Sequence, residues 1–285
     1  MNLEELYALR PTAVQRRFGR QSGALVLSGS DLATAAVNAA VPVCGIDVLR
    51  LELLPCLLRA AEELDVALQL TVGAFAPVDR GGDEPAAVAG ALLTLVDRAR
   101  FVGPLVLAVQ VDWALYPTLP PQALERLLGL IDAGFTSFQF PLPQNRTELT
   151  ATLQLMRIVQ QYGLGSEVID LPTDGLARVV ELFAQRGVAL AAVGEADSGV
   201  GRFAVGGALV PAEQSQRLSL PNATLLSIVA RSLEVEVDEA VFAPIDAVAG
   251  ERIEAVAYAE ARRFMRSARL LGGGSSSLAE LSGAM

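Results

Sequence analysis

The sequence contains no histidine and no lysine. All 22 of its basic residues are arginine, against 32 acidic residues, so the formal net charge is −10. Without lysine, the chain cannot form a Schiff base through a side chain. Without histidine, it lacks the commonest metal ligand and the commonest general base near neutral pH. Reactions that depend on either side chain are therefore excluded.

Long apolar runs are also absent, although 52% of the residues are hydrophobic and the mean hydropathy is +0.42. Charged residues or glycine interrupt each run before the roughly 18 residues that a membrane helix needs. We therefore expect no membrane span. The first twenty residues place acids before bases and contain no central apolar segment, so they do not resemble a signal peptide and we expect a cytoplasmic protein.

Cysteine is scarce as well. Cys44 and Cys56 form no C-x-x-C unit and no disulfide framework, so we expect both to be small buried hydrophobes. The negative net charge argues against nucleic-acid binding, which depends on clustered basic residues. One arginine cluster has the spacing of a solvated helix face, with anion binding as the alternative, and consists of Arg262, Arg263, Arg266 and Arg269.

Short apolar runs alternate with longer helical patterns along most of the chain. Six runs are typical of strands buried on both faces of a parallel sheet: 41–49, 65–73, 103–113, 135–142, 165–171 and 188–194. Three of the helical patterns end at Gly134, Gly163 and Gly187, as helices often do. This alternation predicts an α/β protein, a (β/α)8 TIM barrel with right-handed crossovers. The pattern does not place the last two strands.

We expect three parts in the chain. Residues 1–40 form an N-terminal extension packed on the barrel, in which 23–40 could add a strand and a helix that close one end. Residues 41–271 form the barrel. The segment 272–285 begins with glycines and serines and reads as a flexible C-terminal tail.

Several segments, in order, resemble the class II fructose- and tagatose-bisphosphate aldolases. "PLVLAVQVDW" is similar to the strand that carries metal ligands, "IDAGFTSFQF" to the next strand and "PTDGLARVVELFAQRGVALAAVG" to the sixth unit. The resemblance covers residues 41–201. It implies an aldolase-type barrel and oligomeric assembly. In that family a zinc ion on histidines stabilises the enediolate, and an aspartate acts as acid and base.

The resemblance places Asp112 at the position of the catalytic aspartate. Gln110 and Trp113 then occupy positions where the family has metal-binding histidines. A glutamine is at best a weak oxygen ligand and an indole is no ligand, so a zinc site built from nitrogen ligands is not expected. Trp113 could instead fill the emptied cavity, stack on a ligand or anchor a partner.

Acidic residues fall at or just beyond the carboxyl ends of the expected strands, and these ends form the working face of such barrels. These residues are Asp47, Asp112, Glu167, Asp170, Glu195 and Asp197. Carboxylates suit Mg²⁺ or Mn²⁺, so Asp112, Glu167 and Glu195 are candidate metal ligands. The alternative for each is a helix cap or a partner for arginine.

The segment "GEADSGVGRF" follows the sixth expected strand. Gly199 and Gly201 could expose backbone N–H groups to a phosphate, and Arg202 could add bidentate contacts. A plain strand-to-helix turn is the alternative.

These observations predict a catalytically degenerate class II aldolase-like barrel that acts as a structural, assembly or regulatory subunit. The alternative is a Mg²⁺- or Mn²⁺-dependent aldolase or lyase that acts on a phosphorylated sugar or small keto substrate, with Asp112 as acid/base. A small-molecule sensor is a third hypothesis. We expect a protein partner or homo-oligomer, allow for a small phosphorylated ligand, and expect no cofactor.

Overall fold

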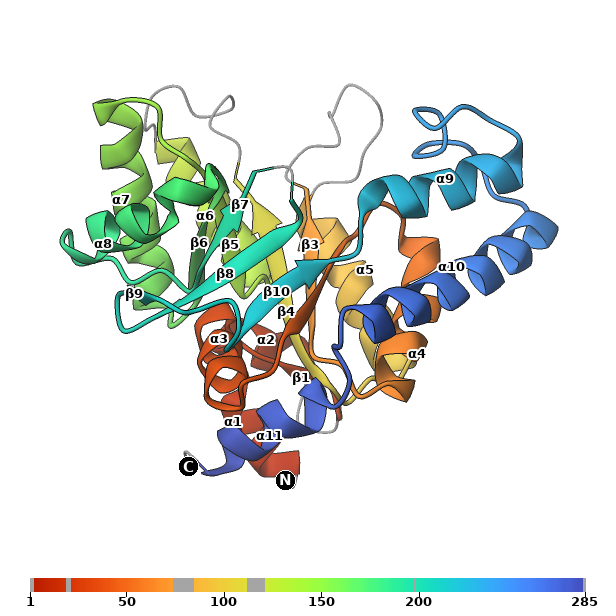
Figure 1. Cartoon of the computed structure of the whole chain (residues 1–285), viewed down its shortest axis with the longest axis horizontal. Coiled ribbons are helices and arrows are strands. Elements are labelled where there is room, and N and C mark those ends of the chain that lie inside the picture. Colours follow the sequence, from red (N-terminus) through yellow and green to blue (C-terminus); the bar gives the residue numbers. More distant parts are fainter. Residues whose placement is uncertain (1–2, 19–21, 74–84, 112–120, 197, 284–285) are drawn as a thin grey trace.

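The chain forms a closed barrel surrounded by helices (Figure 1). A computed structural model describes residues 3–18, 22–73, 85–111, 121–196 and 198–283. The barrel strands are β2 (Val43–Asp47), β3 (Leu68–Val72), β4 (Pro104–Gln110), β5 (Ser137–Pro141), β6 (Gly165–Leu171), β7 (Ala192–Glu195), β8 (Val200–Val205) and β10 (Gln216–Ser219). The eight-stranded α/β barrel expected from the sequence is thereby confirmed, with all six expected strands in place.

One strand departs from the expected all-parallel sheet. Strands β2 to β7 run parallel in chain order. Strand β8 is antiparallel to both β7 and β10, and β10 closes the barrel by pairing parallel with β2. The strand-to-helix turn named as the alternative for the segment after β7 is wrong, because β8 begins at Val200 and pairs antiparallel with β7. A connection this short cannot carry the chain back for another parallel strand.

Helices follow β2 to β6 and cover the outside of the barrel. They are α4 (Leu54–Glu63, after the 3-10 turn Leu51–Leu53), α5 (Pro85–Arg98), α6 (Pro121–Ala133), α7 (Arg146–Gln161) and α8 (Leu176–Ala184, after the 3-10 turn Thr173–Gly175). Local chemistry sets their ends. The Asn145 side chain accepts hydrogen bonds from the backbone N–H groups of Thr147 and Glu148, which starts α7, and Gly163 at φ +69° follows its end.

Residues before β2 close one end of the barrel. Helices α1 (Leu3–Leu9) and α2 (Thr12–Arg17) precede β1 (Leu25–Val26), which pairs with β4, and α3 (Gly29–Asn38). Helix α3 packs its apolar face into a second buried cluster with residues that point into the barrel, among them Val43, Val106 and Phe203. The amino-terminal end of the barrel is therefore filled by side chains.

The last part of the chain forms an arm and a final helix. Helices α9 (Asn222–Leu233) and α10 (Ala247–Ser267) project to one side of the barrel in Figure 1. Helix α11 (Gly273–Gly283) lies against α3 where a flexible tail was expected. The correction has a local cause, because Asp65 accepts hydrogen bonds from the backbone N–H groups of Gly274 and Ser275 at the start of α11. The short strand β9 (Ala208–Leu209) pairs antiparallel with the end of β8.

In the part of the chain that the structure describes, no helix combines the length and the apolar character needed to cross a membrane. This agrees with the expectation of no membrane span.

Both cysteines are buried and free, as expected. Burial raises the pKa of the Cys44 thiol to about 12, and burial is also the main cause of the rise of the Cys56 pKa to about 12. Because the thiolate is the reactive form, we predict that neither thiol of the native protein reacts with a chromogenic disulfide reagent at about pH 8. Unfolding in urea should release both. Fast labelling of the native protein would contradict the packing around these residues.

Glycine allows α3 to approach the barrel. A side-chain carbon at Gly165 would lie 2.7 Å from the backbone of Gly29, whereas one at Gly90, inside α5, would have no neighbour within 4 Å. We therefore predict that Gly165→Ala lowers the free energy of unfolding by about 1–3 kcal/mol. Gly90→Ala should raise it by about 0.5–1 kcal/mol, because alanine favours the helix. Urea unfolding measures both, and equal effects would refute the predicted contact.

Candidate functional site

A buried polar cluster spans the inside of the barrel around Glu167. Its carboxylate accepts hydrogen bonds from side chains on three other strands. Oε1 accepts from Nε2 of Gln69 at 3.0 Å and from Oγ of Ser137 at 3.1 Å. Oε2 accepts from Nε2 of Gln139 at 3.0 Å and from Nη1 of Arg217 at 2.5 Å. Since these residues come from β3, β5, β6 and β10, the cluster ties opposite walls of the barrel together.

The Arg217 guanidinium fits inside the barrel because its neighbours have no side chain. A carbon added at Gly201 on β8 would lie 2.8 Å from Cζ of Arg217, and one at Gly45 on β2 would lie 3.3 Å from its Cδ. Both glycines are paired with β10 residues. Glycines in the two strands beside β10 thus create the space that the arginine fills.

The Glu167 carboxylate has no free capacity to bind another group. Its side chain is 2% exposed and that of Arg217 is 7% exposed. A carboxylate offers about four lone-pair directions, and four donors occupy them here. A metal ion could bind Glu167 only if it displaced some of these donors. The structure therefore places this candidate metal ligand in an internal ion pair rather than at an open mouth.

Gln110 ends β4 beside this cluster. Its backbone is paired with Gln139, which in turn is paired with Glu167 on β6. The position where the resemblance expects a histidine is thus at the level of the polar cluster. Asp112 and Trp113, the next candidate residues, lie outside the described part of the chain, as does Asp197.

The carboxyl end of the barrel carries one further polar pair. Asp47 at the end of β2 accepts a hydrogen bond at 2.8 Å from Nδ2 of Asn222, which begins α9. The Oδ1 atom of Asn222 is buried and accepts no hydrogen bond from the described residues. This pair joins the strand ends of β2 and β10 at the mouth.

The predicted acidic mouth does not form a cluster in the described part of the chain. Glu195 ends β7, and Asp170 lies in the irregular end of β6 with φ +61°. Among the described residues, no three acidic, cysteine or histidine side chains come close enough to hold a metal ion. The described residues therefore provide no group of ligands for a zinc ion. The roles suggested for Glu195 and Asp112 stay predictions.

The candidate phosphate-binding residues belong to the β7–β8 hairpin. Gly199 lies in its turn with φ +65°, and Gly201 lies in β8 against Arg217. Arg202, the next residue, points to the other face of β8 and donates from Nη2 to the carbonyl of Val210 at 2.9 Å. Its Nε is buried without an acceptor among the described residues. Anion binding by these three residues stays a prediction.

Sequence reasoning missed most of the polar cluster. Gln69, Ser137 and Gln139 were not singled out, because the strands that contain them read as nearly continuous apolar runs. Arg217 was missed because the pattern did not place its strand, β10. A signal was nevertheless present. Gln69 in "LQLTV" and Gln139 in "SFQFP" each lie between apolar residues, and Glu167 in "GSEVI" lies between a serine and a valine. Alternation along each strand turns these side chains toward the barrel interior. Pairing Glu167 with Arg217 required the fold.

Comparison with known proteins identifies the architecture. No protein-family model matches the sequence, and no curated protein does. Three similar solved structures are the YdjI aldolase from Escherichia coli K12 (TM-score 0.59, 12% identity, 88% of this chain and 99% of that one), a putative fructose-1,6-bisphosphate aldolase from Coccidioides immitis (0.60, 15%, 86% and 96%) and the fructose-bisphosphate aldolase of Campylobacter jejuni (0.59, 13%, 87% and 96%). At these identities, the likeness shows the fold.

The buried ion pair leads to a stability prediction. Arg217→Met leaves the Glu167 charge buried without its cation, so we predict a loss of about 3–5 kcal/mol in the free energy of unfolding. Adding Glu167→Gln should restore part of that loss, because the uncompensated charge is removed. Urea unfolding of the wild type, both single variants and the double variant measures the coupling. Additive effects would contradict the direct pairing.

Proposed function

We propose that the chain is a catalytically degenerate member of the class II aldolase superfamily, retained as a structural, assembly or regulatory subunit. The likeness to three solved aldolases, each nearly covered end to end, supports the superfamily part of this proposal. The aldolase-like sequence segments over residues 41–201 support it independently. The proposal that catalytic activity has been lost depends on the residues inside the barrel.

The observation that carries the proposal is the state of Glu167. It is a carboxylate held within the barrel, and four donors from the protein itself use its oxygens. A general base or metal ligand needs a free lone pair directed at the substrate or the ion. Glu167 offers none while Arg217 and both glutamines are in place. Its role in this proposal is to hold the barrel together.

The metal chemistry of the superfamily does not fit the residues of this chain. The sequence has no histidine, and Gln110 stands at one of the positions where the resemblance expects that ligand. An amide oxygen is a weak, neutral ligand that does not replace an imidazole at zinc. We therefore propose that the chain catalyses no step through a metal ion, and we expect no cofactor.

A barrel that has lost its catalytic activity can still function through its surface, by binding other molecules. The closed, filled barrel gives a rigid body, and the α9–α10 arm extends from it (Figure 1). We propose a protein partner, or further copies of the chain, as the binding target of this body. A small phosphorylated ligand at the mouth, near Asp47 and Asn222, is compatible with a regulatory role.

An assay of bisphosphate cleavage tests the proposal. The purified chain should not cleave fructose- or tagatose-bisphosphate above a blank, with Zn²⁺, Mg²⁺ or Mn²⁺ added in turn. Asp112→Ala provides the matched control, because it removes the candidate acid/base and should give the same background rate. A coupled assay for the triose phosphate product measures both proteins.

The opposite outcome is well defined. Cleavage that survives removal of contaminating enzymes and disappears in Asp112→Ala would show a working aldolase. It would favour the alternative in which Asp112 acts as acid/base with Mg²⁺ or Mn²⁺ at an acidic mouth.

A further inference from the structure

Three of the four clustered arginines near the end of the chain surround one open hollow on α10. Its lining consists of Tyr258, Ala259, Arg262, Arg263, Arg266 and Ser267. The hollow has a volume of about 600 Å³, which lies within the range of small-molecule sites. Because Ala259 has a small side chain, space remains between the guanidinium groups that project from the next two turns of the helix.

The hollow lies on the outer wall of the molecule. Helix α10 packs on α4, which covers the outside of the barrel (Figure 1). The packed face of α10 repeats every fourth residue and consists of Ala249, Ile253, Ala257, Ala261 and Met265, which are all buried. The residues around the hollow come from other positions of the helix. A ligand bound there would therefore be separate from the barrel mouth.

The lining of the hollow is positively charged, although the chain as a whole carries a formal net charge of −10. It contains three arginines, and none of the acidic side chains that the structure describes belongs to it. Arg266 is exposed and has no ion-pair partner among the described residues. A local positive potential of this kind attracts anions.

The other two arginines are oriented by carboxylates and still have donors to spare. Nη1 of Arg262 lies 3.7 Å from Oε2 of Glu63 and donates to the Tyr258 hydroxyl at 3.2 Å. The Nε of Arg262 is buried without an acceptor in the described part of the chain. Nη2 of Arg263 pairs with Glu260 at 2.5 Å. Since a guanidinium group has five N–H donors, each pair leaves several of them for a ligand.

The helix dipole does not by itself explain the cluster. Basic side chains in the last turn of a helix interact favourably with its carboxyl end, and the effect falls off beyond that turn. Arg266 is the basic residue in the last turn of α10. Arg262 and Arg263 lie one turn earlier, so their presence around the hollow needs another reason.

We infer that this hollow binds a small soluble phosphate compound that carries at least two negative charges. Guanidinium groups match phosphate oxygens in bidentate geometry and are the preferred cations for this purpose. A dianion suits a lining with one unpaired arginine and two that are partly neutralised. The inference rests on the proposed regulatory role and deepens it, because it places the phosphorylated ligand outside the barrel.

The wall of the hollow is held in place before any ligand binds. The Arg59 guanidinium on α4 stacks over the Tyr258 ring at 4.1 Å, and the Tyr258 hydroxyl donates to Glu63 on the same helix. Arg262 donates to that hydroxyl in turn. Tyr258 and Arg262 are therefore already ordered, which lowers the entropy lost on binding.

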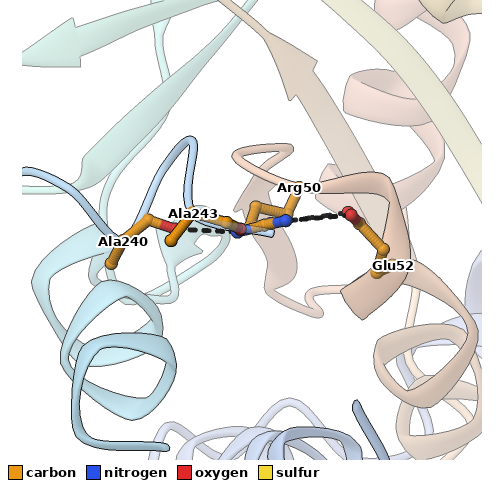
Figure 2. Close-up of polar contacts among 4 residues, drawn as sticks. All are labelled: Arg50, Glu52, Ala240 and Ala243. Carbon is orange, nitrogen blue, oxygen red and sulfur yellow. Dashed lines mark hydrogen bonds and ion pairs between the residues drawn. The ribbon is translucent and has the colours of Figure 1, made fainter. Parts of the chain in front are cut away.

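A second anchor fixes the chain just before α10. The Arg50 guanidinium, 7% exposed, donates from Nη1 to the carbonyls of Ala240 at 2.9 Å and Ala243 at 2.7 Å, and its Nη2 is paired with Glu52 at 3.0 Å (Figure 2). These contacts hold the α9–α10 connection against the loop that follows β2. A ligand on α10 would thus bind a helix that is attached to the barrel at two places.

Calorimetric titration of the full chain with inorganic pyrophosphate tests the inference. The wild type should bind one equivalent saturably. Arg266→Gln should weaken binding by about tenfold or more, because it removes charged donors from the hollow. Arg178→Gln is the matched control: Arg178 is an exposed arginine on α8, on the opposite side of the barrel, and its replacement changes the net charge equally (Figure 1). Its affinity should equal that of the wild type.

A second variant blocks the hollow without removing an arginine. Ala259→Glu places a carboxylate among the guanidinium groups at an exposed helical position, so the protein should fold and binding should be lost. Three results would each overturn the inference: no saturable binding of millimolar pyrophosphate by the wild type, equal weakening by Arg266→Gln and Arg178→Gln, or binding that persists in Ala259→Glu.

The titration also separates this site from the proposed function. Binding that is lost in Asn222→Ala and kept in Arg266→Gln would place the ligand at the barrel mouth, which overturns the site on α10 and leaves the regulatory role standing. Binding on α10 by a chain that cleaves bisphosphates would overturn the proposed loss of activity and leave the site standing.

Discussion

The buried ion pair between Arg217 and Glu167 is the interaction on which the rest of this barrel depends. Burying a charge is costly unless it is paired and hydrogen-bonded, and Glu167 meets both conditions through four donors. The pair joins β6 to β10 across the interior. The position of Arg217 explains why β2 and β8 have glycines beside it. Because four donors use the oxygens of Glu167, this carboxylate has no lone pair left for a substrate or a metal ion. Structure and proposed function thus follow from one contact.

The parallel strands and the outer helices were predictable because their signals are local. Buried runs such as 165–171 and the glycines after α6, α7 and α8 mark elements through periodicity and capping. The reversed β8 was not predictable, because "GEADSGVGRF" fits a strand-to-helix turn as well as a hairpin. Helix α11 was missed because "GGGSSS" carries no helical signal. Its start is instead stabilised by Asp65, a residue far away in the sequence, which accepts a hydrogen bond from the backbone N–H of Ser275.

The candidate site, too, was predictable only where its signals are local in the sequence. Glu167 was singled out because it was expected near the carboxyl end of a barrel strand. Its partner Arg217 is fifty residues away and belongs to a strand that the pattern did not place. The resemblance to aldolases suggested family positions for Gln110, Asp112 and Trp113, and these assignments stay predictions. It could not reveal that the interior carboxylate is neutralised by a cation of the chain itself. Long-range pairing is where sequence patterns carry least information.

A calorimetric titration of the untagged chain, purified without chelator, tests the central claim most directly. Zn²⁺, Mg²⁺ and Mn²⁺ would be added in turn to the wild type and to Glu167→Gln. The account predicts no saturable binding by either protein, because Arg217 and three neutral donors already occupy the carboxylate. Saturable binding near one equivalent that is lost in Glu167→Gln would contradict it, since Glu167 would then be a metal ligand.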